Sequence, residues 1–254
     1  MPTVLITGAN RGLGLEFARQ YAAAGWRVIA TCRQPGEAAH LRELAAQAPA
    51  VVIEALDVTV QSQGVDLAAR LEATPIDLLL LNSAFLGPQT GQRFGGLDSA
   101  LFADSFAANA TGPLRVAEAF VGHVARSALK KIVFLGSAAG AIALLRPPMN
   151  LYAYRASKAA AHLLARGLAL ELAPRGIVVG LVNPGLADTR GLLRLRPDEP
   201  PPEDMAPIVA LVRAGVIQLI TAEVAVQGMI GVIDRLGATQ GGQFFNYDGS
   251  SLPW

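Results

Sequence analysis

The stretch VLITGANRGLG (residues 4–14) decides the fold. A short apolar run passes directly into a turn with three glycines, and a helical pattern of apolar residues follows over 13–24. Gly8 permits a tight turn, Gly12 lets backbone approach a phosphate, and Gly14 lets the helix pack closely on the sheet. The free N–H groups of the helix start would bind the pyrophosphate of a dinucleotide. The glycines are spaced G-x3-G-x-G rather than G-x-G-x-x-G, so their place between strand and helix carries the inference.

The same alternation continues along the chain. Further short apolar runs occur at 28–32, 51–56, 76–81, 131–135, 177–182 and 243–247, and helical patterns at 38–48, 61–72, 98–125, 152–173 and 223–236. Strands that are apolar throughout and alternate with helices are typical of a parallel sheet covered on both faces. We therefore predict one α/β domain over residues 1–254, a Rossmann-type, doubly wound, mostly parallel seven-stranded sheet.

Two segments interrupt this rhythm. Residues 87–97 are glycine-rich and predict a loop, whereas residues 187–207 are charged and proline-rich. No second apolar core follows residues 187–207, so they are not a linker between domains. Long excursions from a compact domain are often binding loops, although some are merely disordered. We interpret 187–207 as a substrate lid.

Composition excludes several classes of function. The chain of 254 residues has a formal net charge of +1 and no Lys/Arg block, so nucleic acid is not expected as a partner. Cys32 is the single cysteine, and the three histidines are widely separated, so neither a disulfide nor a metal site is expected. The N-terminus lacks a signal-peptide pattern and no apolar stretch is long and unbroken enough to span a membrane. We expect a soluble cytoplasmic protein.

The end of the second strand indicates which dinucleotide is bound. Sites that prefer NAD usually place a carboxylate there, on the ribose hydroxyls. This chain has Cys32 and Arg33 instead, and Arg11 in the glycine turn could reach the same region. Two guanidinium groups favour the additional 2′-phosphate of NADP(H). The alternative is that Arg33 is a solvated loop residue.

Tyr154 and Lys158 are the candidate proton-transfer pair. Residues four apart lie on one face of a helix, so the Lys158 ammonium can lie beneath the Tyr154 hydroxyl. Free tyrosine has a pKa near 10, and we expect the ammonium and an oxidised nicotinamide to lower it. Such a pair often occurs by chance, but Ser137 follows the apolar run 131–135, where ligands of parallel sheets gather. Together the three residues indicate hydride transfer between a nicotinamide and a carbonyl/alcohol pair.

At this point the chain resembles the short-chain dehydrogenase/reductase family over nearly its whole length. The motifs that carry the resemblance are TGANRGLG (7–14), Asp57-Val58, Asn82, NATG (109–112), Ser137, YRASK (154–158) and NPG (183–185). ITGANRGLGLEFARQ, ATCR, YAYRASKAA and GGQFFNYDG further resemble the C-factor and Sniffer-like carbonyl reductase subgroup.

The resemblance implies a role for each matching residue. Tyr154 would be the general acid or base, Ser137 would orient the carbonyl, and Lys158 would lower the tyrosine pKa and hold the ribose. Asn109 would hold a water that links Lys158 to solvent. The implied cofactor-binding set is Gly8, Asn10, Arg11, Gly12, Leu13, Gly14, Arg33, Asp57, Val58, Asn82, Ser83, Ala84, Tyr154, Lys158, Pro184, Gly185, Leu186 and Thr189. Asp57 could alternatively cap the next helix, and NPG could be an ordinary turn.

One position departs from the family pattern. Asn82-Ser83-Ala84-Phe85 replaces the usual Asn-Asn-Ala-Gly, so Phe85 either points into the core or narrows the pocket near the nicotinamide. The expected substrate-lining residues are Phe85, Leu145, Met149 and Leu192. They favour a hydrophobic ketone, aldehyde or imine, or the corresponding alcohol or amine, unless they belong to the core. Competing functions are an NADP(H)-binding sensor or signalling protein and a short-chain epimerase or dehydratase. Helices 98–125 and 152–173 resemble those through which relatives pair, so we expect a homodimer or homotetramer.

Overall fold

All seven predicted strands form in the computed structural model, which describes residues 1–147, 149–196, 199–202 and 205–254. They are β1 (Thr3–Ile6), β2 (Arg27–Cys32), β3 (Val51–Ala55), β4 (Leu78–Leu81), β5 (Lys131–Leu135), β6 (Val178–Asn183) and β9 (Phe244–Asn246). Every neighbouring pair is parallel, in the order β3-β2-β1-β4-β5-β6-β9. The order reverses between β1 and β4, which is where open α/β sheets bind their ligands. The predicted fold class is therefore confirmed.

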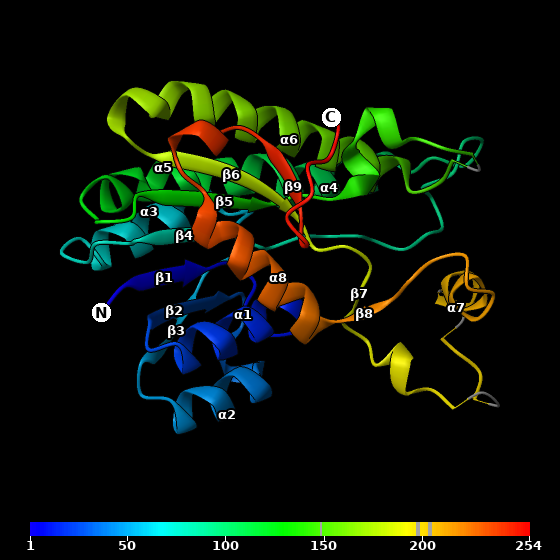
Figure 1. Cartoon of the computed structure of the whole chain (residues 1–254), viewed down its shortest axis with the longest axis horizontal. Coiled ribbons are helices and arrows are strands. Elements are labelled where there is room, and N and C mark those ends of the chain that lie inside the picture. The colour runs from blue at the N-terminus through cyan, green and yellow to red at the C-terminus, as the bar shows by residue number, and fades with distance from the viewer. Residues whose placement is uncertain (148, 197–198, 203–204) are drawn as a thin grey trace.

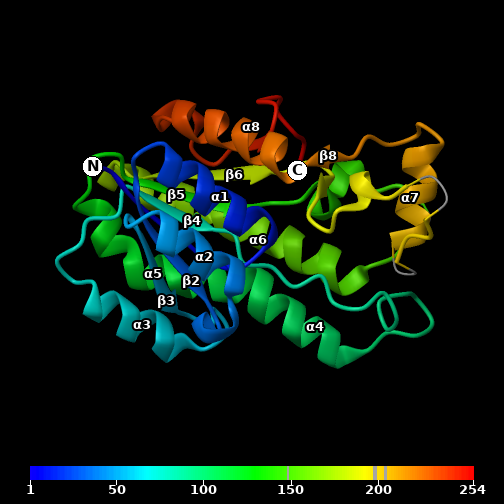
Figure 2. The same ribbon diagram turned by 90° about the horizontal axis from the view of Figure 1, so that it is seen from below.

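Helices cover both faces of the sheet (Figure 1, Figure 2). They are α1 (Gly12–Ala23), α2 (Ala39–Gln47), α3 (Gln61–Arg70), α4 (Ser99–Phe106), α5 (Gly112–Ala125), α6 (Tyr152–Leu172) and α8 (Ala222–Arg235). One buried cluster joins the sheet to Phe17 of α1 and Met229 of α8, and a second joins it to Leu67 of α3 and Phe120 of α5. The strands are apolar on both sides because both sides pack against a helix layer.

The helical pattern predicted over 98–125 is confirmed, with a π turn inside it that the sequence did not reveal. The structure has α4, then a π-helical turn over Ala107–Thr111, then α5. The turn brings Asn109 inside, where it is 2% exposed. A Cβ added at Gly112 would lie only 2.7 Å from the Val58 carbonyl oxygen, so this approach requires glycine. Single π turns inside helices often occur at functional sites, and this one carries a predicted site residue.

The excursion after β6 is longer and more ordered than predicted. β7 (Ala187–Asp188) pairs in parallel with β8 (Ile220–Thr221), and α7 (Ala206–Arg213) lies between them, apart from the sheet layers (Figure 1, Figure 2). Leu192, Val209 and Leu219 form a small core of their own. The boundary at residue 207 was too early because the prolines suggested irregular chain, whereas proline is well tolerated in the first turn of a helix. Residues 197–198 and 203–204 of the predicted lid lie outside the described residues.

Candidate active site

The carboxyl edge of the sheet collects the predicted site residues because all its strands run in one direction. The Thr7 hydroxyl, just after β1, accepts hydrogen bonds of 3.0 Å from the backbone N–H groups of Asn82 and Ser83, just after β4. The side-chain amide of Asn82 donates in return to the Gly8 carbonyl at 3.1 Å. These bonds tie together the two strand ends at the point where the strand order reverses. The sequence motif contained Thr7, but we assigned it no task.

The glycine turn has the geometry that its spacing predicted. Gly8 and Gly12 have φ of +68° and +56°, in the left-handed region that favours glycine. A Cβ added at Gly14 would lie 2.2 Å from the Gly8 carbonyl oxygen, so α1 can approach the turn only without a side chain there. No side chain caps the start of α1, where Arg11 is the N-cap residue. The first N–H groups of the helix therefore remain available to an anion.

Two arginines flank the turn. Arg11 and Arg33 are both exposed, and neither forms an ion pair with any residue in the described ranges. A Cβ added at Gly12 would lie 3.4 Å from the Thr189 side chain, so the loop after β6 crosses beside the turn. The groups predicted to bind the pyrophosphate and the 2′-phosphate thus lie together at the carboxyl edge of the sheet.

Asp57 does not cap a helix. Its Oδ1 accepts from the Thr59 N–H at 2.9 Å and from the Thr59 hydroxyl at 2.7 Å, which closes a turn before α3. The N-cap of α3 is Val60, so the capping alternative is wrong. Among the described residues, none donates a hydrogen bond to the other carboxylate oxygen of Asp57, which follows β3 at the same sheet edge.

Ser137, Tyr154 and Lys158 come together as the sequence predicted. The Tyr154 hydroxyl lies close enough to the Ser137 side chain for the serine to favour the phenolate. The Lys158 ammonium lies 5.9 Å from the centre of the Tyr154 ring and donates to the Leu135 carbonyl at 2.9 Å. Lys158 is buried, and the described residues offer it no carboxylate partner. The arrangement places a phenol, a hydroxyl and a buried cation beside one another.

The pKa of Tyr154 is raised, not lowered as we predicted. Burial disfavours the phenolate and outweighs the opposite effects of the Ser137 hydrogen bond and the Arg155 charge. Lys158 does not reverse this balance, because its ammonium points to the Leu135 carbonyl. Burial also lowers the pKa of Lys158 to about 8. With the protein's own groups alone, Tyr154 is a neutral phenol at neutral pH, the form that can donate a proton.

The Asn109 side chain is committed to protein atoms. Its Oδ1 accepts from the Phe85 N–H at 2.6 Å, and its Nδ2 donates to the Phe85 carbonyl at 2.8 Å and to the Ser157 hydroxyl at 2.9 Å. Both amide hydrogens are therefore used. Asn109 fixes the chain after β4 against α6, and its implied part in a proton relay through water stays a prediction.

Phe85 does not join the hydrophobic core. It belongs to neither of the two sheet clusters, is half-buried, and its ring lies next to Gly87, where an added Cβ would be 3.2 Å from ring carbon Cε1. Of the two alternatives for this residue, the core position is wrong. The ring packs on its own loop, beside the chain that Asn109 holds.

The other expected substrate-lining residues differ in their placement. Leu145 and Met149 are half-buried in the segment after Ser137. Leu192 is 8% exposed because it packs in the small core of the excursion with Val209 and Leu219. The expected contact of Leu192 with a substrate stays a prediction. In the structure, Leu192 stabilises the excursion.

Sequence reasoning missed two residues that hold Ser137. His162 follows Lys158 by one helical turn, and its Nε2 accepts from the Ser137 N–H at 3.2 Å. Its ring packs on Phe244, with ring centres 4.7 Å apart. Asn183, at the end of β6, accepts from the Ala138 N–H at 2.9 Å. The NPG motif contained Asn183, but His162 gave no sequence signal because its partners lie on distant elements.

His162 makes stability depend on pH. Burial, and next the Lys158 charge, lower its pKa to about 4 from the usual 6.5. Since the unfolded chain binds the proton first, stability is lost as pH falls from about 6.5 towards 4, by about 3 kcal/mol in total. We expect the free energy of unfolding in urea to fall between pH 7.5 and pH 4 by about 3 kcal/mol less in His162→Gln than in the wild type. Glutamine keeps a hydrogen-bond acceptor but does not titrate. An equal pH dependence in the two proteins would contradict this assignment.

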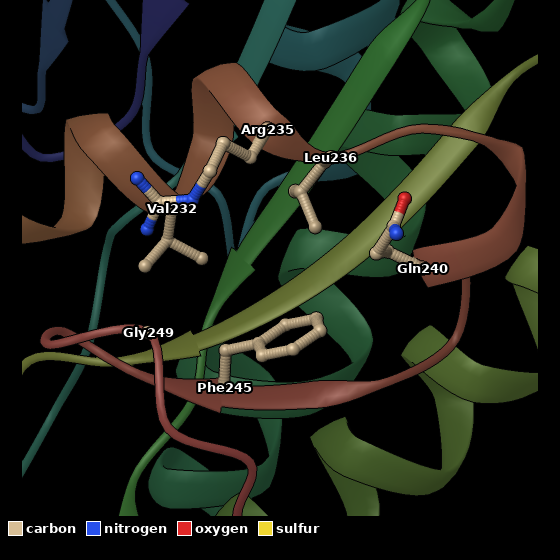
Figure 3. A pocket seen from close by; sticks show the side chains of 6 residues that line it. All are labelled: Val232, Arg235, Leu236, Gln240, Phe245 and Gly249. Carbon is tan, nitrogen blue, oxygen red and sulfur yellow. The ribbon is translucent and has the colours of Figure 1, made fainter.

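A pocket of about 210 Å³ lies away from these residues (Figure 3). It is lined by Val232, Arg235, Leu236, Gln240, Phe245 and Gly249, from α8 and the chain around β9. None of the predicted site residues lines it. We assign it no part in the chemistry.

Two further properties concern the whole of the described chain. Within residues 1–147, 149–196, 199–202 and 205–254, no group of three or more His, Cys, Asp or Glu residues is placed to hold a metal ion. In the same ranges no helix combines the length and the apolar character needed to cross a bilayer.

Comparison with known proteins agrees with this geometry. Residues 2–200 match the model of the short chain dehydrogenase family. The chain belongs to this family and is an oxidoreductase of the short-chain dehydrogenase/reductase class. It is 32% identical over 180 residues to C-signal of Myxococcus xanthus, covering 71% of this chain and 93% of that protein.

Solved structures of carbonyl reductases are similar over the full length. The NADPH-bound carbonyl reductase from chicken fatty liver superposes with a TM-score of 0.82 at 27% identity, covering 100% of this chain and 99% of the other. The carbonyl reductase Sniffer of D. melanogaster gives a TM-score of 0.81 at 25% identity, with both chains covered completely. The resemblance to this subgroup, predicted from the motifs, is confirmed.

Proposed function

We propose that this protein is an NADP(H)-dependent reductase of hydrophobic carbonyl compounds, with Tyr154 as the proton donor. The observation that carries the proposal is the joint position of Ser137, Tyr154 and Lys158 at the carboxyl edge of the sheet, next to the glycine turn. The NADPH and NADP complexes of similar carbonyl reductases support the choice of cofactor. A sensor that binds the same cofactor would not need the buried Lys158 and its tyrosine.

The residues present fit a dinucleotide. In the glycine turn, a Cβ at Gly14 would collide with the Gly8 carbonyl, so a side chain there would fill the space beside the turn. The start of α1 is uncapped, so its N–H groups can bind an anion. We infer that this turn holds the pyrophosphate, that Arg11 and Arg33 hold the 2′-phosphate, and that Asp57 is placed for the adenine. The remaining set proposed for the cofactor is Asn10, Leu13, Val58, Asn82, Ser83, Ala84, Tyr154, Lys158, Pro184, Gly185, Leu186 and Thr189.

The chemistry divides between cofactor and protein. NADPH supplies the hydride that reduces the carbonyl carbon. Ser137 and Tyr154 orient the carbonyl oxygen with their hydroxyls and stabilise the negative charge that develops on it. Tyr154 then donates its proton, for which its neutral form is the competent one. Lys158, whose ammonium lies 5.9 Å from the centre of the Tyr154 ring, would hold the ribose of the bound cofactor.

The substrate side favours an apolar compound. Phe85, Leu145 and Met149 are half-buried around the carboxyl edge, and the excursion after β6 lies over the same edge (Figure 2). We propose that the chain is a single domain with a substrate lid near residues 187–207, and that the described residues from there to β8 support this lid. Pairing into a homodimer or homotetramer through the long helices, and a cytoplasmic location, stay predictions.

Thermal unfolding with cofactors tests the binding part of the proposal. At a concentration about 100 times Kd, a ligand stabilises the folded state by about 2.7 kcal/mol, which corresponds to about 5–10 °C in Tm for a chain of this size. We expect NADPH to raise Tm by this amount and NADH at the same concentration to raise it much less. A larger rise with NADH would refute the assignment of Arg11 and Arg33.

A further inference from the structure

A buried glutamine in the glycine-rich loop holds the catalytic helix. Gln92 lies between β4 and α4, in the segment that follows the carboxyl end of β4, and is 0% exposed. Its Nε2 donates to the carbonyls of Leu86 and Pro88, both at 2.8 Å. Its Oε1 accepts from the N–H of Tyr154 at 3.0 Å. One amide therefore joins the loop after Phe85 to the backbone of the predicted proton donor.

Gln92 also replaces the missing cap of α6. The residue before the helix, Leu151, has a left-handed φ of +54° and offers no side-chain cap. The first-turn N–H groups need acceptors from elsewhere. The backbone carbonyl of Gln92 accepts from the Tyr152 N–H at 3.1 Å, and its side chain accepts from Tyr154. One residue of a distant loop thus accepts hydrogen bonds from two N–H groups of the first turn of α6.

The carbonyl of Tyr154 is held from the same loop. It accepts from the Ser157 hydroxyl at 2.8 Å, and Ser157 accepts in turn from Asn109, which also holds both backbone groups of Phe85. The loop therefore contacts Tyr154 through Gln92 on the N–H side and, through Asn109 and Ser157, on the carbonyl side. Movement of the loop would be transmitted to the phenol by both routes.

We propose that Gln92 is a positioning residue that sets the place of the Tyr154 hydroxyl and couples it to the substrate-side loop 85–92. The inference rests on the proposed function of Tyr154 and extends it. A displacement of about 1 Å in a reacting group can cost about 10²-fold in rate. Loss of the Gln92 hydrogen bonds that hold Tyr154 should therefore have a measurable effect. The amide suits this task because it donates to two carbonyls and accepts from an N–H at once.

The test compares Gln92→Leu with Arg93→Ala, because the neighbouring Arg93 is exposed and its side chain makes no hydrogen bond or ion pair with the described residues. Rates are divided by the concentration of sites that bind NADPH, so that unfolded protein does not count. We then expect kcat of Gln92→Leu with a hydrophobic ketone to fall about 10- to 100-fold, while the Kd for NADPH stays within about twofold. Arg93→Ala should match the wild type. If Gln92→Leu lowers only Tm and keeps the wild-type kcat per site, the residue is merely structural and the proposal is wrong.

Gln92→Glu gives an internal control should the leucine variant not fold. A protonated carboxyl can still accept from Tyr154 and donate to one loop carbonyl, whereas a carboxylate donates nothing and faces two carbonyl oxygens. We expect the kcat of Gln92→Glu, divided by the wild-type kcat at the same pH, to fall as pH rises. Burial raises the pKa of the introduced carboxyl, so the fall should occur above the usual glutamate pKa of about 4.3. If the ratio of the variant kcat to the wild-type kcat does not change with pH, the proposed role of the Gln92 hydrogen bonds is wrong.

Hydrogen exchange separates this proposal from the proposed function. Exchange of the peptides covering 85–92 and 152–156 should rise together at least about tenfold in Gln92→Leu, since both lose their common amide. If the wild type does not oxidise NADPH with any hydrophobic ketone, the proposed function is wrong. Hydrogen exchange would still show whether Gln92 couples loop 85–92 to the first turn of α6. Unchanged exchange in either peptide would refute it.

Discussion

Replacing Tyr154 by phenylalanine is expected to abolish most turnover while leaving NADPH binding intact. The variant loses the proposed proton donor and one of the two hydroxyls proposed to bind the carbonyl oxygen, and a positioned acid contributes about 10²–10⁴-fold to rate. The ring and its packing remain, so the Kd for NADPH should change less than about threefold. Absorbance at 340 nm measures turnover, and the quench of protein fluorescence on titration measures binding.

Tyr152→Phe is the matched control for this variant. Tyr152 lies on the same helix, two residues earlier, and its hydroxyl makes no hydrogen bond with the described residues. It should retain the wild-type rate. Comparable losses in both variants would indicate a general effect on α6, and near-normal turnover in Tyr154→Phe would remove the tyrosine from the mechanism.

Removing both guanidinium groups beside the glycine turn should change cofactor preference. In Arg11→Ala/Arg33→Ala we expect the Kd for NADPH to rise about 10²-fold, taking about 1.4 kcal/mol, or tenfold, for each exposed charge-assisted contact. The Kd for NADH, which lacks the 2′-phosphate, should stay within about threefold. Isothermal titration at one fixed ionic strength measures both constants.

Arg175→Ala controls for the loss of positive charge. Arg175 is exposed and precedes β6, at the opposite edge of the sheet from the glycine turn. Its removal should leave both constants unchanged. If the double variant weakens NADPH and NADH equally, the arginines act on the shared pyrophosphate, and the preference for NADP(H) has another origin.

Local patterns in the sequence predicted the parts of the site that depend on spacing. The three glycines between β1 and α1 need particular backbone angles, so their residue type alone reveals the turn. Tyr154 and Lys158 are one helical turn apart, and their common face follows from helix geometry. The apolar strands predicted a sheet buried on both sides for the same reason, since alternation with helices leaves no exposed face.

Contacts across the chain could not be predicted in this way. Gln92 stands in a glycine-rich loop with no periodic pattern, and its partner Tyr154 is 62 residues away. His162 binds Ser137 through a contact that only the folded sheet creates. The π turn at Asn109 and the raised pKa of Tyr154 have the same origin, because both depend on how closely distant elements pack. The sequence therefore predicted which groups lie together at the candidate site better than it predicted what holds them.

Transfer of deuterium from NADPH that carries deuterium at both C4 positions to a hydrophobic ketone tests the central assignment most directly. The wild-type protein should give an alcohol with one deuterium on the carbinol carbon for each NADPH consumed, as mass spectrometry would show. Tyr154→Phe, saturated with the same cofactor, should form this product at least about 10²-fold more slowly. An unlabelled alcohol, or equal rates of labelled product from both proteins, would contradict hydride transfer assisted by Tyr154.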